Sequence, residues 1–182
     1  MEVEIDTEAN SIEASKKDPK AFEAIYNRYF DQIFLFINKR LMDEESAFDV
    51  TQQVFFNALT NLKQYQYRGV PFASFLYKIA INECNQYFRD QRKVRHVSIN
   101  EEAIEGFSEE VFSIDRTERA MEQLAKVIQS LKHEELTLIE LRYFEQRSYM
   151  EIAEILGRSV SNCKVQVHRI IKKLKKNFRH EE

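Results

Sequence analysis

The histidines and cysteines are the residues best suited to catalysis or metal binding, and their spacing supports neither. None of the four histidines stands at ligand spacing from a carboxylate or cysteine pair; they are His96, His133, His168 and His180. Cys84 and Cys163 lie far apart, so no disulfide framework or multi-cysteine zinc site is indicated. The sequence also lacks a phosphate-binding loop, a nucleophile elbow and a His-Glu-x-x-His motif. We therefore expect no catalytic residue, no metal site and no cofactor.

Side chains that can read DNA bases cluster near the C-terminus. Ser148 and Glu151 have the spacing of a capping box. Gly157 can end that helix and Ser159 can begin the next, which is typical of a helix-turn-helix. The outer face of the second helix carries Ser161, Asn162, Lys164, Val165, Gln166 and Arg169, and Lys172 continues the basic stretch. Amides can pair with adenine, cations with guanine and apolar groups with the thymine methyl, which favours DNA binding over an ordinary amphipathic helix.

A second cluster mixes aromatic, polar and basic side chains in the middle of the chain. Its members are Tyr65, Tyr67, Arg68, Tyr77, Lys78, Asn82, Gln86, Arg89, Arg92, Lys93 and Arg95. Aromatic faces can stack on unpaired bases while cations hold the backbone. We expect Phe72 and Leu76 to be core residues, and Tyr67, Arg68, Tyr77, Lys78, Asn82 and Gln86 to be exposed. Spacing alone leaves open whether this cluster binds single-stranded nucleic acid or only packs.

The net charge of −3 conceals a strong segregation of charge along the chain. Residues 63–95 carry seven basic and two acidic side chains, and residues 158–182 carry eight and two. Residues 1–62 and 96–157 are net acidic. Two basic blocks separated by acidic ones would allow the protein to hold a polyanion at two separate places.

The elements that must position these clusters are predicted to be helices. The 182 residues include 43% hydrophobic side chains but only three glycines and two prolines, and apolar residues recur at helical spacing. The chain is predicted to be all-α, with a helical domain over residues 1–95 and a helix-turn-helix domain over 118–182. An acidic, flexible linker is expected over 96–117, although its apolar residues indicate that it docks somewhere. No membrane-length apolar run or signal peptide is present, so we expect a soluble, intracellular protein.

Three stretches of the chain carry a family resemblance. They are SAFDVTQQVFFNAL (46–59), YRGVPFASFLYKIAINECNQYFRDQRK (67–93) and ELTLIELRYFEQRSYMEIAEILGRSVSNCKVQVHRIIKKLKK (135–176). The first resembles the polymerase-binding helix of bacterial sigma factors, and the second resembles their promoter-melting segment. The third resembles the helix-turn-helix that reads the upstream promoter element. Their order and spacing are similar to those of the compact extracytoplasmic-function (ECF) group.

The resemblance implies a specificity subunit of RNA polymerase, not an enzyme, in the bacterial cytoplasm. Core RNA polymerase would be bound through its β′ clamp and β flap, with Asp49, Gln52, Gln53 and Phe56 on the clamp. Tyr65, Tyr67, Arg68, Tyr77, Lys78, Asn82 and Gln86 would capture a flipped base of the −10 element in single-stranded DNA, and Arg89, Arg92, Lys93 and Arg95 would hold phosphates. Ser161, Asn162, Lys164, Val165, Gln166, Arg169 and Lys172 would read the −35 element in duplex DNA. The linker would run toward the RNA exit path, and an anti-sigma factor would be a further partner.

Some positions depart from the family pattern. Gln53 stands where a glutamate is usual, Phe75 where a tryptophan is customary, and Gln86 where Asn or Asp is common. Val165 and Gln166 replace a small polar and a basic residue, which favours adenine and thymine contacts at the −35 element. The alternative function is a stand-alone helix-turn-helix regulator with an N-terminal sensor domain, and binding to core polymerase would discriminate between the two.

Overall fold

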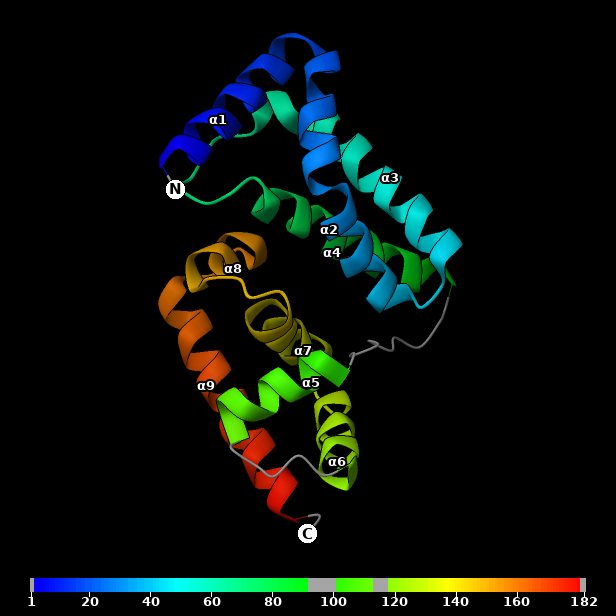
Figure 1. Cartoon of the computed structure of the whole chain (residues 1–182), viewed down its shortest axis with the longest axis vertical. Helices are drawn as coiled ribbons and strands as arrows, with labels where there is room; N and C mark the ends of the chain where they lie inside the picture. The colour runs from blue at the N-terminus through cyan, green and yellow to red at the C-terminus, as the bar shows by residue number, and fades with distance from the viewer. Residues whose placement is uncertain (1, 92–100, 113–117, 181–182) are drawn as a thin grey trace. The chain divides into compact units, whose positions relative to one another are not determined.

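The computed structural model describes residues 2–91, 101–112 and 118–180, and every regular element in these ranges is a helix (Figure 1). The chain divides into two compact units, Met1–Val97 and Ser98–Glu182. The all-α prediction is thereby confirmed for the described residues. No helix in this part of the chain is long and apolar enough to cross a membrane.

The first unit is built from α1 (Glu2–Lys17), α2 (Glu23–Leu41), α3 (Glu44–Asn61) and α4 (Ala73–Gln91). Helices α2, α3 and α4 pack against one another around a core that includes Ile33, Phe36, Ile37, Val54, Leu76 and Ala80 (Figure 1). The Asp18 carboxylate accepts a hydrogen bond from the Lys20 N–H at 3.0 Å and caps a 3-10 turn, Pro19–Phe22. The Asp43 carboxylate accepts one from the Ser46 N–H at 3.2 Å and caps α3.

Glu8 of α1 links three parts of the first unit. Its buried carboxylate accepts hydrogen bonds from the Tyr29 hydroxyl on α2 and from the Phe72 backbone N–H just before α4. Burial, followed by the hydrogen bond and the charge of Glu8, raises the pKa of Tyr29 well above its usual range. The hydroxyl therefore keeps its proton and stays a donor. Glu8 thus joins α1 to α2 through Tyr29, and to the junction between the 65–71 loop and α4 through Phe72.

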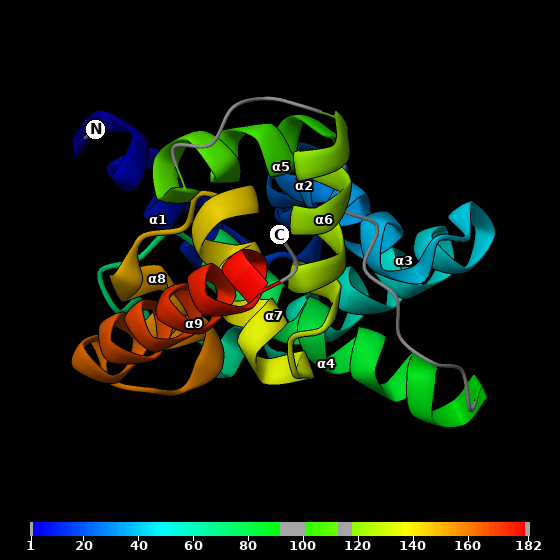
Figure 2. The ribbon, with the colours of Figure 1, turned by 90° about the horizontal axis from the view of Figure 1, so that it is seen from below.

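The second unit contains five helices among its described residues. They are α5 (Glu101–Phe107), α6 (Glu118–Gln129), α7 (His133–Ile139), α8 (Tyr149–Leu156) and α9 (Val160–His180). Helices α5 and α7 continue into π-helical turns, Ser108–Phe112 and Glu140–Phe144. Helices α6, α7 and α8 all contact α9, whose length is seen in Figures 1 and 2. The second unit thus presents α9 as its longest surface helix.

Residues 101–112 differ from the sequence-based expectation of a linker. They are helical and belong to the second unit, where Ile104, Phe107 and Val111 are buried. The Phe107 ring packs edge-on against Tyr143, with centroids 4.9 Å apart, and the Phe112 ring packs against Phe178 at 5.4 Å. The abundant glutamates of this segment obscured an apolar spacing that suits a helix. This finding corrects the 96–117 linker for residues 101–112; residues 96–100 and 113–117 lie outside the described part of the chain.

Candidate functional site

Local hydrogen bonds build the helix-turn-helix as the sequence predicts. The Ser148 hydroxyl accepts from the Glu151 N–H at 3.2 Å, and the Glu151 carboxylate accepts from the Ser148 N–H at 2.9 Å, which completes the capping box. Gly157 ends α8 with φ of +64°, a left-handed conformation that glycine adopts without strain. The Ser159 hydroxyl accepts from the Asn162 N–H at 3.2 Å and opens α9. The turn between α8 and α9 is therefore closely determined by its sequence.

The α9 face is defined by the seven predicted −35 residues: Ser161, Asn162, Lys164, Val165, Gln166, Arg169 and Lys172. Six of the seven are exposed, and Gln166 is half-buried. The opposite side of α9 buries Cys163, Val167, Ile170 and Leu174 in the unit's core. Burial raises the pKa of the Cys163 thiol, which suits a packing residue and not a nucleophile. Most of the α9 face is thus accessible to a ligand.

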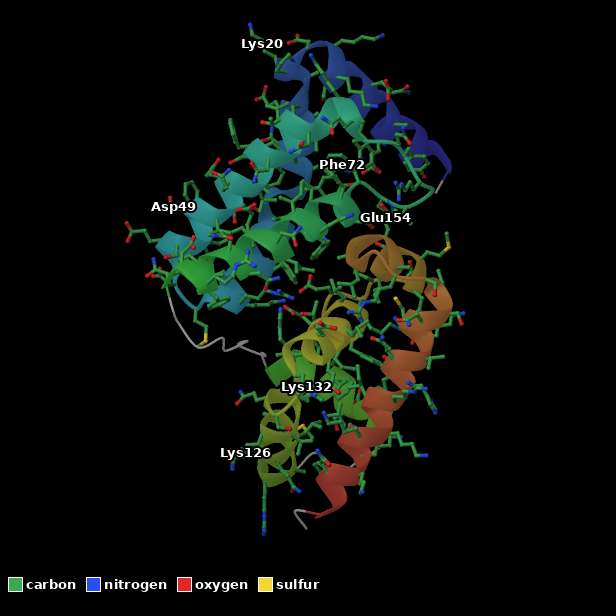
Figure 3. The ribbon with its side chains drawn as sticks, turned by 180° about the vertical axis from the view of Figure 1, so that it is seen from behind. Lys20, Asp49, Phe72, Lys126, Lys132 and Glu154 are labelled. Carbon is green, nitrogen blue, oxygen red and sulfur yellow. The ribbon has the colours of Figure 1, made fainter. Side chains whose placement is uncertain are left out.

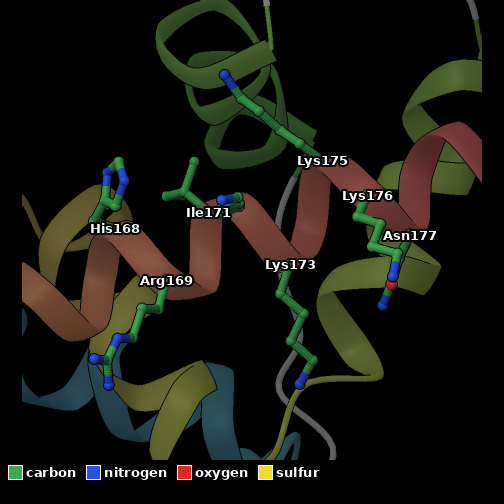
Figure 4. Close-up of a pocket in the computed structure, with 8 residues that line it drawn as sticks. His168, Arg169, Ile171, Lys173, Lys175, Lys176 and Asn177 are labelled. Carbon is green, nitrogen blue, oxygen red and sulfur yellow. The ribbon is translucent and has the colours of Figure 1, made fainter.

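The C-terminal half of α9 adds an open, basic hollow of about 1120 Å³. It is lined by His168, Arg169, Ile171, Lys172, Lys173, Lys175, Lys176 and Asn177. Figure 4 shows the labelled basic side chains leaving α9 in several directions instead of converging on one point. The Lys173 ammonium pairs with the Glu135 carboxylate at 2.7 Å. Diverging cations of this kind suit an extended polyanion better than a small ligand.

The first unit carries six residues that the family resemblance assigns to the −10 element and its melting, and we call them the melting surface: Tyr67, Arg68, Lys78, Asn82, Gln86 and Arg89. All six residues are exposed, and Tyr67 retains 46% of its accessible surface. Gln86 donates to the Asp90 carboxylate at 2.8 Å and accepts from Arg89 at 2.6 Å, so its amide is oriented along α4. The surface brings an aromatic face, amides and cations together on one loop and one helix.

Tyr65 and Gly69 shape the loop of the melting surface. The half-buried Tyr65 ring packs against Phe72 and Phe75, with centroids 5.0 Å and 4.9 Å apart. Gly69 has a φ of +76°, which side-chain-bearing residues rarely adopt. Tyr65 therefore supports the loop from below while Tyr67 stands on its surface.

Tyr77 departs from the prediction that it is exposed. It has no accessible surface, its ring packs edge-on against Phe36 at 4.8 Å, and its hydroxyl accepts from the Gln32 amide at 3.0 Å. The expectation was wrong because Tyr77 lies on the side of α4 that packs against α2, where the half-buried Gln32 donates to its hydroxyl. Arg92, Lys93 and Arg95 lie outside the described residues.

The α3 face is defined by Asp49, Gln52, Gln53 and Phe56, which recur at helical spacing and are all exposed. Figure 3 shows Asp49 on the outer side of α3. Phe56 exposes 63% of its surface, an unusual amount for a large aromatic side chain. Gln52 donates to the Tyr26 hydroxyl at 3.0 Å and Gln53 to the Asn57 side chain at 3.0 Å. An acid, two amides and an uncovered ring together suit a protein partner.

Family models match both units. The family model described as Sigma-70 region 2 matches residues 25–94, and the one described as Sigma-70, region 4 matches residues 121–174. The RNA polymerase sigma factor YlaC of Bacillus subtilis (strain 168) is 30% identical over 167 residues, which span 89% of this chain and 94% of that protein. The ECF RNA polymerase sigma factor SigW of the same strain is 24% identical over 180 residues, 92% of this chain and 94% of that protein. The chain belongs to the ECF-type RNA polymerase sigma factors.

Solved structures share the fold of this sigma factor. CnrH in complex with the cytosolic domain of CnrY aligns with a TM-score of 0.63 at 17% identity, covering 96% of this chain and 99% of that one. The sigma factor RpoE in complex with the anti-sigma factor NepR from Bartonella quintana aligns with a TM-score of 0.57 at 18% identity, covering 90% and 99%. Sigma factors direct transcription initiation and are not enzymes, and the same holds for this chain. The stand-alone regulator is therefore not supported.

Sequence reasoning did not single out two residues that orient these surfaces. Glu8 holds the junction below the melting surface, and Arg158 donates a hydrogen bond to Gln166 on the α9 face. No local pattern marks Glu8, because its partner Phe72 is 64 residues away. For Arg158 the one signal in the sequence was its place in the turn, directly after Gly157.

Proposed function

We propose that this sigma factor reads the −35 element in duplex DNA with the α9 face. The observation that carries the proposal is that six of the seven residues of this face are exposed on the second helix of a complete helix-turn-helix. Helices presented in this way enter the major groove with polar side chains toward base edges. The diverging cations at the C-terminal half of α9 then contact phosphates on either side of the groove.

The melting surface captures a flipped base of the −10 element in this proposal. Tyr67 supplies an exposed stacking face, and Asn82 and Gln86 supply amides that pair with the edge of an unstacked base. Arg68, Lys78 and Arg89 hold the neighbouring phosphates. Tyr65 and the buried Tyr77 act from within, by supporting the loop and the helix that present these side chains.

The α3 face binds the β′ clamp of core RNA polymerase, and the second unit binds the β flap. The support for the clamp contact is the exposed Phe56 ring beside the Asp49 carboxylate and two amides. Gln53 contributes a hydrogen bond without a charge. An anti-sigma factor holds the sigma factor inactive, a proposal supported by the complex of the related RpoE with NepR.

Co-elution with core RNA polymerase at moderate salt tests the proposed binding of the α3 face to the polymerase. The wild-type chain is expected to form a nanomolar complex that Asp49→Ala and Gln52→Ala weaken at least tenfold. Lys20→Ala is the matched control, because Lys20 is exposed at an end of the first unit away from Asp49 (Figure 3). Failure of the wild-type chain to bind, with duplex DNA binding intact, would overturn the polymerase-binding proposal.

A further inference from the structure

Lys173 lies at the edge of the α9 face, next to a carboxylate that comes from another helix. It follows Arg169 by four residues, and Figure 4 shows both side chains leaving the same side of α9. The Lys173 ammonium pairs with the Glu135 carboxylate at 2.7 Å. Glu135 belongs to the first turn of α7, so the pair places a negative charge beside the side of α9 that we propose faces DNA.

A second hydrogen bond keeps the Glu135 carboxylate in place. The oxygen that accepts from Lys173 also accepts from the Lys132 backbone N–H, at 3.0 Å. The Glu135 side chain is 27% exposed, and that of Lys173 is 40% exposed. Because a backbone group anchors it, the carboxylate keeps its charge at this edge of the α9 face when a ligand approaches.

The effect of this carboxylate on DNA binding follows from charge and not from the number of donors. An ammonium has three N–H groups, so Lys173 can donate to a phosphate while it still donates to Glu135. A phosphate in that position meets a positive charge with a fixed negative charge close behind it, and the repulsion offsets much of the attraction. The pair has no net charge, so it displaces few counterions from DNA.

Lys172 and Lys176 lie on the same helix and are both exposed. They follow Arg169 by three and seven residues, so they continue the α9 face toward the C-terminal end of the helix. In homeodomains, which are helix-turn-helix variants, this end of the recognition helix contacts the DNA backbone. The two lysines therefore stand where phosphates would pass.

We propose that Glu135 lowers the affinity of this sigma factor for DNA by offsetting the charge of Lys173. The phosphate contacts of the C-terminal half of α9 then come mainly from other cations, among them Lys172 and Lys176. Because phosphate contacts carry no sequence information, a larger share of the affinity is left to base contacts. The inference rests on the proposed reading of the −35 element by the α9 face, and it narrows the phosphate contacts of that proposal.

The test measures binding of duplex promoter DNA by the full-length sigma factor in complex with core polymerase, over a salt series. The wild-type complex first selects the DNA from a library randomised across the −35 element, and a scrambled −35 sequence is measured beside it. Glu135→Gln removes the charge and keeps an acceptor for the Lys132 N–H. It is expected to tighten binding to both DNAs about three- to eightfold, and to steepen the slope of log K against log salt by up to about 0.9, the value for one phosphate contact.

A double variant, Glu135→Gln with Lys173→Ala, distinguishes the role of Lys173 from that of the carboxylate alone. It has the net charge of the wild type and lacks the pair, so it is expected to bind within about twofold of the wild type. If the double variant kept the gain, Glu135 would act by repulsion at a distance and not through Lys173, which would overturn the inference. An unchanged affinity in Glu135→Gln would also overturn it, whatever the double variant does.

Arg169→Ala and Lys176→Ala separate the inference from the proposed function. If neither weakens binding, the α9 face does not meet DNA, and the proposed reading of the −35 element is lost together with the inference. If either weakens binding but Glu135→Gln does not tighten it, only the inference is overturned.

Discussion

The Glu8 carboxylate accepts a hydrogen bond from the Phe72 backbone N–H at 3.1 Å, across 64 residues of sequence. Phe72 directly precedes α4, which carries most of the melting surface. The bond therefore ties α1 to the place where the loop with Tyr67 and Arg68 passes into that helix. A helix outside the proposed promoter-binding surfaces thus helps to shape one of them.

Replacing Glu8 should destabilise the first unit. Glu8→Ala leaves the Phe72 N–H and the Tyr29 hydroxyl without this partner, and the loss is expected to be about 1–3 kcal/mol of unfolding free energy. Glu8→Gln is the matched control, because its amide can still accept from Phe72 and donate to Tyr29. Urea unfolding followed by circular dichroism measures both variants; equal midpoints for Glu8→Ala and wild type would refute the role.

Tyr77 should matter for stability and not for promoter melting. Tyr77→Phe removes the acceptor for the Gln32 amide and should cost about 1 kcal/mol, while leaving permanganate reactivity of the melted strand unchanged. Asn82→Ala should leave stability nearly unchanged and lower the permanganate reactivity of the melted strand, because Asn82 is exposed on the melting surface. Normal permanganate reactivity in Asn82→Ala would remove Asn82 from the base-capturing group.

Glu135 should make stability depend on pH in the acidic range. Burial acts to raise the pKa of Glu135, but the hydrogen bonds from Lys173 and from the Lys132 N–H, with the charges of both lysines, hold it below its usual value. The stability from this carboxylate is present above the unfolded pKa of about 4.3 and is lost as pH falls through the lower folded value.

Thermal unfolding of wild type and Glu135→Gln over a pH series measures this contribution. The wild type should lose roughly 0.5–1 kcal/mol more than the variant on acidification, a modest effect because the pair is partly exposed to solvent. Parallel pH profiles for the two proteins would show that the Lys173–Glu135 pair contributes nothing.

Phe107 should anchor residues 101–112 to the second unit. Its ring is 2% exposed and packs against Tyr143, so Phe107→Ala is expected to cost about 3–5 kcal/mol. Glu105→Ala is the control, since Glu105 is exposed on the same helix. Chemical unfolding should separate the two variants, and an unchanged midpoint in Phe107→Ala would mean that the contact is not formed in solution.

Features that depend on neighbouring residues were predictable from the sequence, and features that depend on distant ones were not. The caps at Ser148 and Ser159 follow from spacings of three residues, and both form as expected. The burial of Tyr77 depends on how α4 packs on α2, which local periodicity does not determine. The bond from Arg158 to Gln166 depends on the conformation of a three-residue turn.

The packing of residues 101–112 decides where a shortened form of this protein can begin. A piece that starts at Glu118 would follow the boundary drawn from sequence, but it would remove the buried Ile104, Phe107 and Val111. The Tyr143 and Phe144 rings, against which Phe107 packs, would lose that contact. Such a piece would expose an apolar surface and would be prone to aggregate. A fragment that contains the second unit should therefore start ahead of Glu101.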